Sequence, residues 1–271
     1  MKLHGKSVLV TGAASGIGRA IARRVANEGP SVVVCVDKNE SGASAVSNEI
    51  AAAGTPSYSV AVDLADREAI ELLASVVTER SGGTDVLFAN AGVSFGGGLD
   101  TLEEAWQTSW EVNVMAQVRL ARSFLPGMIE RGGGYIVNTA SAAGLLTNLG
   151  GLSYSVTKHG SVALSEWMAI THARDNIKVS VLCPMGVRTN MLFPEEGRQN
   201  EEHRLAQAAV LEAGDVLEPE VVADKVLEAM DAEQFLILPH ESVRGFYSFR
   251  ANDTDKWIAS MARYQQRLGG A

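Results

Sequence analysis

The sequence predicts an α/β fold in which a doubly wound, seven-stranded parallel sheet carries helices on both faces within a single domain. Two observations support this prediction. Short apolar runs rich in β-branched residues alternate with longer stretches of helical periodicity along most of the chain, a pattern typical of strand–helix–strand units. A length of 271 residues and a hydrophobic content of 46% are also sufficient for one large domain.

The expected strands are short, mainly apolar runs, and several have no polar alternation, which indicates burial on both faces. They lie at 8–10, 31–37, 58–62, 85–89, 135–139, 177–183 and 235–238. The expected helices have apolar residues at helical spacing between these runs. They begin near 17 and cover about 40–53, 66–80, 102–130, 154–170 and 219–230, and a helical tail covers about 242–271.

A glycine-rich turn joins the first strand to the first helix. Its spacing places Gly12, Gly16 and Gly18 between an apolar strand and the helical pattern that begins at Ile17. Glycine permits a tight turn, and the missing side chains let backbone N–H groups and a helix N-terminus approach an anion. The strand–turn–helix order predicts a Rossmann-type site for a dinucleotide pyrophosphate. The same turn also contains Ser15.

Asp37 ends the second strand about 20 residues beyond the glycine turn, where an acid can accept hydrogen bonds from adenine-ribose hydroxyls. The alternative is an acid that is simply solvated at a strand end. Because a carboxylate repels a 2′-phosphate, Asp37 favours NAD (NADH) over NADP, although the neighbouring Lys38 could permit NADP. Asp63–Leu64 and Asn90–Ala91–Gly92 follow the next two strands, so they are expected at the same edge of the sheet.

Tyr154 and Lys158 are four residues apart on an expected helix and therefore share a face. A nearby ammonium favours a phenolate, so the pair could serve as a general acid/base, although many such pairs are surface coincidences. Ser141 follows the fifth strand and could hydrogen-bond a reacting oxygen, or could simply belong to a turn. Asn113 lies inside a helical stretch, where its propensity is mildly unfavourable.

Taken together, these motifs resemble the short-chain dehydrogenases/reductases in their short single-domain form, over residues 5–240. The resemblance implies that Tyr154 is the general acid/base and that Ser141 orients the reacting oxygen. It implies that Lys158 lowers the tyrosine pKa and binds the nicotinamide ribose, while Asn113 holds a water that relays protons. It also implies hydride transfer between a secondary alcohol or ketone and a nicotinamide, and self-association as a homo-oligomer, a tetramer or a dimer.

The same resemblance implies further cofactor contacts in the loop after the sixth strand. Val187, like Ile17, would contact the cofactor through its backbone, Thr189 would bind the carboxamide, and Pro184 opens the loop. The loop departs from the family pattern of Pro-Gly, because Met185 follows Pro184 and Gly186 comes one residue later. This change could place a thioether in the pocket.

The substrate pocket is expected to be apolar. Residues placed in it by position are Leu145, Leu146, Leu149, Met185, Met191, Leu192 and Phe193, with core packing of each as the alternative. None is charged, which favours a neutral, apolar and cyclic or aromatic alcohol or ketone. The segment 190–215 is interpreted as a lid, with an ordinary helical insertion as the alternative. The tail carries Trp257, Met261, Tyr264 and Leu268 on one helical face, which indicates core packing, or alternatively subunit contact.

Composition limits which binding partners, locations and metal sites are expected. A net charge of −9 argues against nucleic acid or an anionic membrane as the main partner. No apolar run approaches a membrane span, and no signal-peptide pattern is evident, so a cytoplasmic location is expected. Cys35 and Cys183 lie in apolar runs and are expected to be buried free thiols. The five histidines, at positions 4, 159, 172, 203 and 240, show no metal-ligand spacing.

Two rival functions are compatible with the fold. One is a non-catalytic NAD(H)-binding regulatory protein, which would have no need of the acid/base set. The other is a sugar-nucleotide epimerase, which needs a larger substrate domain than this chain can hold.

Overall fold

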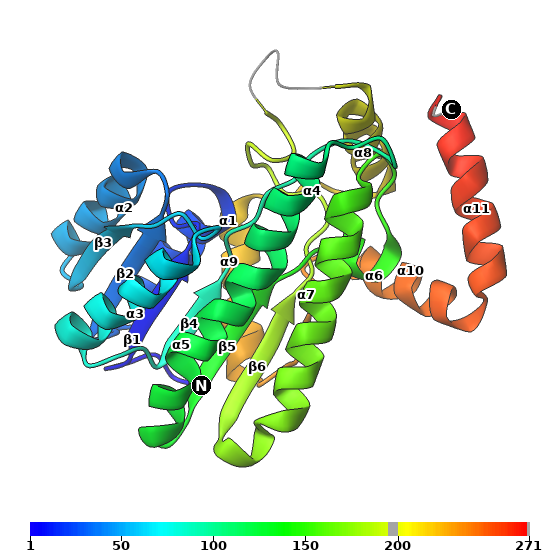
Figure 1. The fold of residues 1–271 in the computed structure, drawn as a ribbon. Helices are drawn as coiled ribbons and strands as arrows, with labels where there is room; N and C mark the ends of the chain where they lie inside the picture. The colour runs from blue at the N-terminus through cyan, green and yellow to red at the C-terminus, as the bar shows by residue number, and fades with distance from the viewer. Residues whose placement is uncertain (195–199, 270–271) are drawn as a thin grey trace.

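A computed structural model of the chain describes residues 1–194 and 200–269. Within this part of the chain, seven parallel strands form one sheet in the order β3-β2-β1-β4-β5-β6-β7 (Figure 1). The strands are β1 Ser7–Thr11, β2 Val32–Asp37, β3 Ser57–Ala61, β4 Val86–Ala89, β5 Gly134–Thr139, β6 Ile177–Leu182 and β7 Leu236–Ile237. The predicted doubly wound single domain is confirmed.

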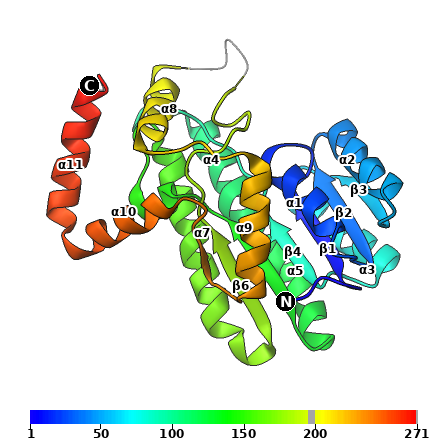
Figure 2. The same ribbon diagram turned by 180° about the vertical axis from the view of Figure 1, so that it is seen from behind.

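Helices cover both faces of the sheet (Figures 1 and 2). The longer ones are α1 Gly16–Ala26, α2 Glu40–Ala52, α3 Arg67–Ser81, α5 Ala116–Glu130, α7 Leu152–Thr171 and α9 Pro219–Asp231. Buried residues of α1, α2 and α9 pack in one core cluster, and buried residues of α3, α5 and α7 pack in another. The two clusters lie on opposite faces because successive side chains of a strand alternate: Val8 and Val10 belong to the first, and Leu9 to the second.

The chain reverses direction across the sheet between β1 and β4. From β1 it runs outward through β2 to β3, then crosses to β4 beside β1 and continues outward to β7. Val8 pairs with Val33 on one side and with Val86 on the other. Such a switch point opens a crevice at the carboxyl ends of the strands.

The expected long helix at 102–130 is interrupted. It consists of α4 Glu103–Trp110, a π-helical turn η1 Glu111–Met115, and α5. Hydrophobic periodicity did not reveal the π turn, because this turn inserts one extra residue while the helix axis continues. A short helix, α6 Ala143–Leu146, also follows β5, and a single turn of 3₁₀ helix, η2 Ala173–Asp175, follows α7.

The C-terminal third contains the expected lid and the expected helical tail. The proposed lid contains helix α8 Glu201–Ala213, whereas positions 195–199 of that segment lie outside the described residues. The tail forms two helices, α10 Glu241–Asn252 and α11 Thr254–Arg267, joined at Asp253. We refer to α10 and α11 together as the C-terminal arm.

Both cysteines are free and buried, as expected. Burial raises the pKa of the Cys35 thiol to about 11 and that of Cys183 to about 12, so both thiols stay protonated. Across residues 1–194 and 200–269, no helix combines the length and the apolar character needed to cross a membrane.

Candidate active site

A cavity of about 920 Å³ lies at the carboxyl edge of the sheet. Its walls come from the loops after β1, β2, β3, β4, β5 and β6, from α7 and α8, and from the C-terminal arm. Almost every predicted cofactor residue lines it, namely Gly12, Ser15, Gly16, Ile17, Asp37, Asp63, Leu64, Asn90, Ala91, Gly92, Tyr154, Lys158, Pro184, Val187 and Thr189. The structure therefore brings together residues from most of the chain.

The glycine turn has the geometry of an anion cradle. Gly12 and Gly16 have φ angles of 69° and 53°, in the left-handed region that glycine adopts without strain. Gly18 is not in the cavity wall; a Cβ there would overlap the carbonyl oxygen of Gly12, so its role is close packing of turn and helix. The Ser15 side chain makes no capping hydrogen bond. The first N–H groups of α1 thus remain available to a phosphate.

Asp37 is held against the glycine turn. Its Oδ2 accepts a hydrogen bond from the Ala14 backbone N–H at 3.0 Å, and its Oδ1 accepts one from the Asn39 N–H at 2.9 Å. These contacts fix the carboxylate at the cavity wall, beside the turn. Both carboxylate oxygens of Asp37 are therefore hydrogen-bonded to the backbone, and its role toward a ribose stays a prediction.

A hydroxyl network joins the ends of the central strands. Thr11, fully buried, donates its hydroxyl to the Phe88 carbonyl at 3.2 Å and accepts from the N–H groups of Asn90 at 2.9 Å and Ala91 at 3.1 Å. The Asn90 amide donates back to the Thr11 carbonyl at 3.0 Å and accepts from the Thr139 hydroxyl at 3.2 Å. Sequence reasoning did not assign a role to Thr11 or Thr139.

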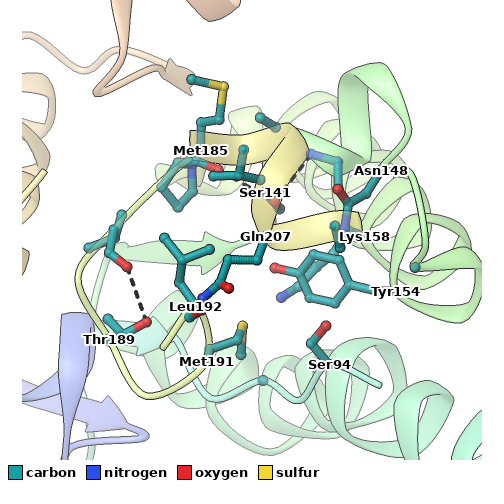
Figure 3. A pocket seen from close by; sticks show the side chains of 18 of the residues that line it. Ser94, Ser141, Asn148, Tyr154, Lys158, Met185, Thr189, Met191, Leu192 and Gln207 are labelled. Atoms are coloured by element: carbon teal, nitrogen blue, oxygen red, sulfur yellow. Dashed lines mark hydrogen bonds between the residues drawn. The ribbon is translucent and has the colours of Figure 1, made fainter. Parts of the chain in front are cut away.

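Tyr154 and Lys158 project from α7 into the cavity beside Ser141 (Figure 3). The ammonium of Lys158 is 98% buried and donates to the Thr139 carbonyl at 2.8 Å. Its Nζ lies 5.6 Å from the centre of the Tyr154 ring. The Ser141 hydroxyl accepts from the Ala143 N–H at 3.1 Å. The same hydroxyl donates to the Pro184 carbonyl at 3.4 Å, and it faces the cavity beside the Tyr154 hydroxyl (Figure 3).

Burial dominates the electrostatics of this pair. It raises the pKa of Tyr154, while the hydrogen bond from Ser141 acts in the opposite direction. Burial also lowers the pKa of Lys158 to about 8. The expectation that the ammonium by itself lowers the tyrosine pKa is thus not met in the protein alone, because removal from water penalises both charged forms.

Asn113 lies in the π turn η1, fully buried behind the cavity wall and not in it. Its Nδ2 donates to the Val93 carbonyl at 2.9 Å and to Thr157 Oγ1 at 3.0 Å, and its Oδ1 accepts from the Val93 N–H at 2.8 Å. The amide therefore ties the loop after β4 to α7. A Cβ on Gly92 would lie 3.1 Å from Lys158 Nζ and 3.2 Å from this Oδ1, which shows how tightly the three groups pack.

His240 holds the loop that follows β6. Its Nδ1 accepts from the Met185 N–H at 3.2 Å, and its Nε2 lies 2.9 Å from the Gly186 carbonyl oxygen. Since Nδ1 is an acceptor, the proton is on Nε2, which donates to Gly186. The ring is 95% buried at the start of α10, and burial lowers its pKa. Nothing in the sequence pattern indicated this contact.

The lining of the cavity includes most of the residues expected in the substrate pocket, whose role stays a prediction. These residues are Leu146, Leu149, Met185, Met191 and Leu192. Leu145 does not line the cavity, because it is buried in a core cluster beneath α6. Phe193 does not either: its side chain is 36% exposed, and the guanidinium of Arg188 lies 5.5 Å from its ring centre.

Three polar side chains near Tyr154 were not predicted: Ser94, Asn148 and Gln207 (Figure 3). Gln207 lies on α8 and donates to the Leu192 carbonyl at 2.6 Å. Asn148 follows Thr147, whose φ of 76° is rare outside glycine. Polar residues in a loop and on an amphipathic helix carry no periodic signal, so only the fold identifies them. Over the described ranges, no group of three or more His, Cys, Asp or Glu side chains could hold a metal ion.

Comparison with known proteins agrees with this geometry. The family model for short chain dehydrogenases matches residues 6–200. A 3-oxoacyl-[acyl-carrier-protein] reductase of Vibrio cholerae is 33% identical over 227 residues, covering 83% of this chain and 90% of the relative. Among solved structures, a short chain dehydrogenase/reductase from Burkholderia phymatum in complex with NAD has a TM-score of 0.85 and 31% identity, over 94% of this chain and 96% of the other. L-sorbose reductase from Gluconobacter frateurii, complexed with NADPH and L-sorbose, has a TM-score of 0.76 and 30% identity, over 88% and 95%.

The Thr11 network yields a stability prediction. Thr11→Val keeps the shape of the side chain but leaves the N–H groups of Asn90 and Ala91 without their acceptor. An unpaired buried group costs about 1–3 kcal/mol. Because these two N–H groups are only partly buried, we expect a combined loss of about 2–4 kcal/mol in the free energy of unfolding. Urea denaturation of Thr11→Val and of the control Thr11→Ser measures it. Equal stability of the two variants would contradict the network.

The buried His240 yields a pH prediction. Because burial lowers its pKa in the folded protein, the unfolded chain takes up the proton more readily, and stability falls as the pH drops below about 6.5. Asp215 opposes this shift and Lys225 adds to it. We expect His240→Gln to lose less stability than the wild type between about pH 7.5 and 5.5. Thermal unfolding at several pH values checks this; parallel curves would argue that His240 does not titrate in this range.

Proposed function

The chain belongs to the short-chain dehydrogenase family, and from that premise we propose that it is an oxidoreductase that interconverts a secondary alcohol and a ketone with NAD(H). One observation carries the proposal: Tyr154, Ser141 and Lys158 face the same continuous cavity that the glycine turn and Asp37 line. A hydride-transferring site requires this arrangement, because the acid/base must stand next to a cofactor bound along the sheet edge.

The residues present fit a nicotinamide dinucleotide. Side chains are absent where a pyrophosphate would approach the first turn of α1, and the N–H groups there are free of a side-chain cap. Asp37 is fixed where it can accept hydrogen bonds from ribose hydroxyls. Its negative charge supports NAD over NADP. Similar solved structures hold NAD in one case and NADPH in another, so the preference rests on Asp37 of this chain.

In alcohol oxidation, the Tyr154 phenolate would accept the proton of the substrate hydroxyl, and in reduction the phenol would return it. Ser141 would donate a hydrogen bond to the same oxygen and so orient the reacting carbon. A bound nicotinamide supplies the carbon that accepts or donates the hydride. Proton transfer of this kind contributes about 10²–10⁴-fold to the rate.

Lys158 would act through charge. Its ammonium is held by the Thr139 carbonyl at the base of the cavity, and with a pKa of about 8 it is largely protonated at neutral pH. Burial alone opposes the phenolate. The positive charge of an oxidised nicotinamide beside the phenol would favour the phenolate. We therefore infer that Tyr154 becomes an effective base only when the oxidised cofactor is bound.

The role of Asn113 as holder of a relay water stays a prediction. Its amide already makes three hydrogen bonds, to Val93 and Thr157. We propose that Asn113 is a positioning residue, which sets the loop after β4 against the helix that carries Tyr154 and Lys158.

The substrate class follows from the walls around Tyr154. Leu149, Met191 and Leu192 are apolar, while Asn148 and Gln207 can each make a hydrogen bond without adding charge. These residues favour a neutral, mainly apolar alcohol or ketone. None of these five side chains is charged; cations of the same cavity wall include Lys158, which donates to the Thr139 carbonyl, and Arg263 and Arg267 of the C-terminal arm. We propose that the segment 190–215 acts as a lid, since α8 of this segment contributes Gln207 to the wall.

The rival functions are less well supported. A regulatory protein that only senses NAD(H) does not need Tyr154, Ser141 and Lys158 to converge. A sugar-nucleotide epimerase needs a second domain, whereas the described residues form one. Self-association as a dimer or tetramer stays a prediction; Trp110, Trp167 and Ile170 have exposed side chains that could take part. A cytoplasmic location also stays a prediction.

Replacing Tyr154 tests the catalytic proposal. Tyr154→Phe removes the hydroxyl that transfers the proton, so we expect a loss of about 10²–10⁴-fold in kcat/KM with NADH affinity unchanged. Absorbance of the reduced nicotinamide, with a panel of secondary alcohols and ketones, measures the rate, and fluorescence titration measures NADH binding. Turnover that survives the change would refute Tyr154 as the acid/base; binding of NADH without turnover in the wild type would favour the regulator.

Replacing Asp37 tests the cofactor preference. Asp37→Asn keeps the shape but removes the charge that repels a 2′-phosphate, so we expect NADPH to bind about tenfold more tightly than to the wild type and NADH to bind less tightly. Lys38→Gln is the matched control for the neighbouring cation. If the wild type prefers NADPH and Lys38→Gln loses that preference, Lys38 rather than Asp37 sets the specificity.

A further inference from the structure

The cavity continues beyond Tyr154 to the C-terminal arm. Phe246 of α10 and Trp257, Met261 and Tyr264 of α11 line it together with the residues around the acid/base. In Figures 1 and 2, α11 lies at the opposite end of the molecule from β2 and β3, beyond α8. The arm is therefore remote from the end of the cavity where Asp37 stands. It also lies outside the family model, which ends at residue 200.

The wall contributed by the arm has an apolar part and a polar part. Phe246, Trp257 and Met261 form the apolar part, and the polar part comes from α11, namely Ser260, Arg263, Tyr264 and Arg267. Trp257 is 91% buried, and Phe246 and Met261 pack against the same core cluster. The rings of Phe246 and Trp257 lie 6.4 Å apart. Aromatic and thioether side chains form an adaptable surface for hydrocarbon. Trp257, Met261 and Tyr264, whose spacing indicated core packing, therefore also form part of the cavity wall.

Met185 lies between the part of the cavity beside Tyr154 and the part lined by the C-terminal arm. Figure 3 shows its side chain pointing away from Tyr154, and it packs against the cluster that contains Trp257. A Cβ on Gly214 would lie 3.0 Å from the Met185 methyl, so the thioether reaches the end of α8. The unusual residue after Pro184 therefore belongs to the passage between the two parts of the cavity.

Both helices of the arm are fixed to the body. On α11, the Tyr264 hydroxyl donates to the Ala209 carbonyl of α8 at 2.9 Å, and Arg267 pairs with Glu212 at 2.7 Å. On α10, Arg250 donates to the Leu145 carbonyl and lies 3.2 Å from His159 Nε2. These contacts hold the apolar wall in place against α6, α7 and α8.

We propose that the C-terminal arm forms a distal subsite that binds a hydrocarbon tail of the substrate. The proposal rests on the proposed function, because the tail must extend from the carbon that reacts beside Tyr154. A linear tail several carbons long would pass Met185 and lie against Trp257 and Met261. Each buried methylene should then raise kcat/KM by about fourfold.

The test uses a series of alkan-2-ols, from butan-2-ol to dodecan-2-ol, with NAD⁺. Met261→Trp fills the subsite with a larger side chain, and Ile258→Trp makes the same change at a side chain of α11 that is 59% exposed. In the wild type we expect kcat/KM to rise with chain length. In Met261→Trp we expect no change for butan-2-ol but a loss of about tenfold or more for the longest alcohols. Ile258→Trp should match the wild type.

Met261→Ala covers the case in which the larger side chain disturbs folding. It enlarges the subsite, so the chain length with the highest kcat/KM should increase. Calorimetric binding of dodecan-2-one gives a second readout that needs no turnover: Met261→Trp should weaken binding, and Ile258→Trp should not.

A wild-type series with no dependence on chain length, or an equal loss at all lengths in Met261→Trp, would overturn the distal subsite and leave the proposed oxidoreductase intact. If no alcohol or ketone of any kind is turned over, the proposed function fails instead. In that case, calorimetry with dodecan-2-one still decides whether the arm binds hydrocarbon.

Discussion

The candidate site depends on the hydroxyl of Thr11, which joins the two central strands at their carboxyl ends. Parallel strands place their ends at one edge, but the ladder between β1 and β4 stops at Val10 and Phe88. Beyond this point the Thr11 hydroxyl replaces the ladder with three hydrogen bonds, and Asn90 carries the connection on to Thr139. The carbonyl of Thr139 then receives the ammonium of Lys158. The position of the buried charge is thus set by a chain of contacts that begins at the glycine turn.

Burial determines how this site can use its ionisable groups. Lys158 is buried and Tyr154 is half-buried at the cavity wall, and burial shifts the pKa of each toward its neutral form. In this environment a nearby charge has a strong effect, because little water screens it. A cofactor that is cationic when oxidised and neutral when reduced can therefore change the basicity of Tyr154 with its redox state. The protein alone keeps the phenol protonated.

Much of the fold and of the cofactor site could be predicted from the sequence. Apolar runs, the glycine spacing and Asp37 report local constraints, and the parallel sheet brings strand ends together by necessity. Other features depend on contacts between distant segments. His240 meets the backbone of Met185 and Gly186 from 54 or more residues away, and a polar residue at a strand end has no pattern that distinguishes it. Leu145 and Phe193 were expected to line the cavity, but they do not. Apolar character indicates that a side chain is buried and does not indicate whether it faces the cavity or the core.

The C-terminal arm is a second case in which sequence periodicity does not identify the contacts of a helix. Trp257, Met261 and Tyr264 were recognised as one helical face, yet periodicity cannot identify what that face meets. The answer depends on α10, which carries α11 across the end of α6 to α8. The apolar face of α11, which would ordinarily pack in a core, here forms part of the cavity wall.

The π turn η1 has a consequence for how helix faces are counted. In an α-helix, residues three apart lie on the same side. Trp110, at the end of α4, is 42% exposed, whereas Asn113 is fully buried. The extra residue of the turn shifts the two helices out of phase, so α4 and α5 present independent faces although they share one axis. The one extra residue of the π turn therefore sets the orientation of the buried Asn113 amide, which contacts the loop after β4 and α7. Removal of one residue from this turn would bring α4 and α5 back into phase and rotate Asn113 away from Val93 and Thr157.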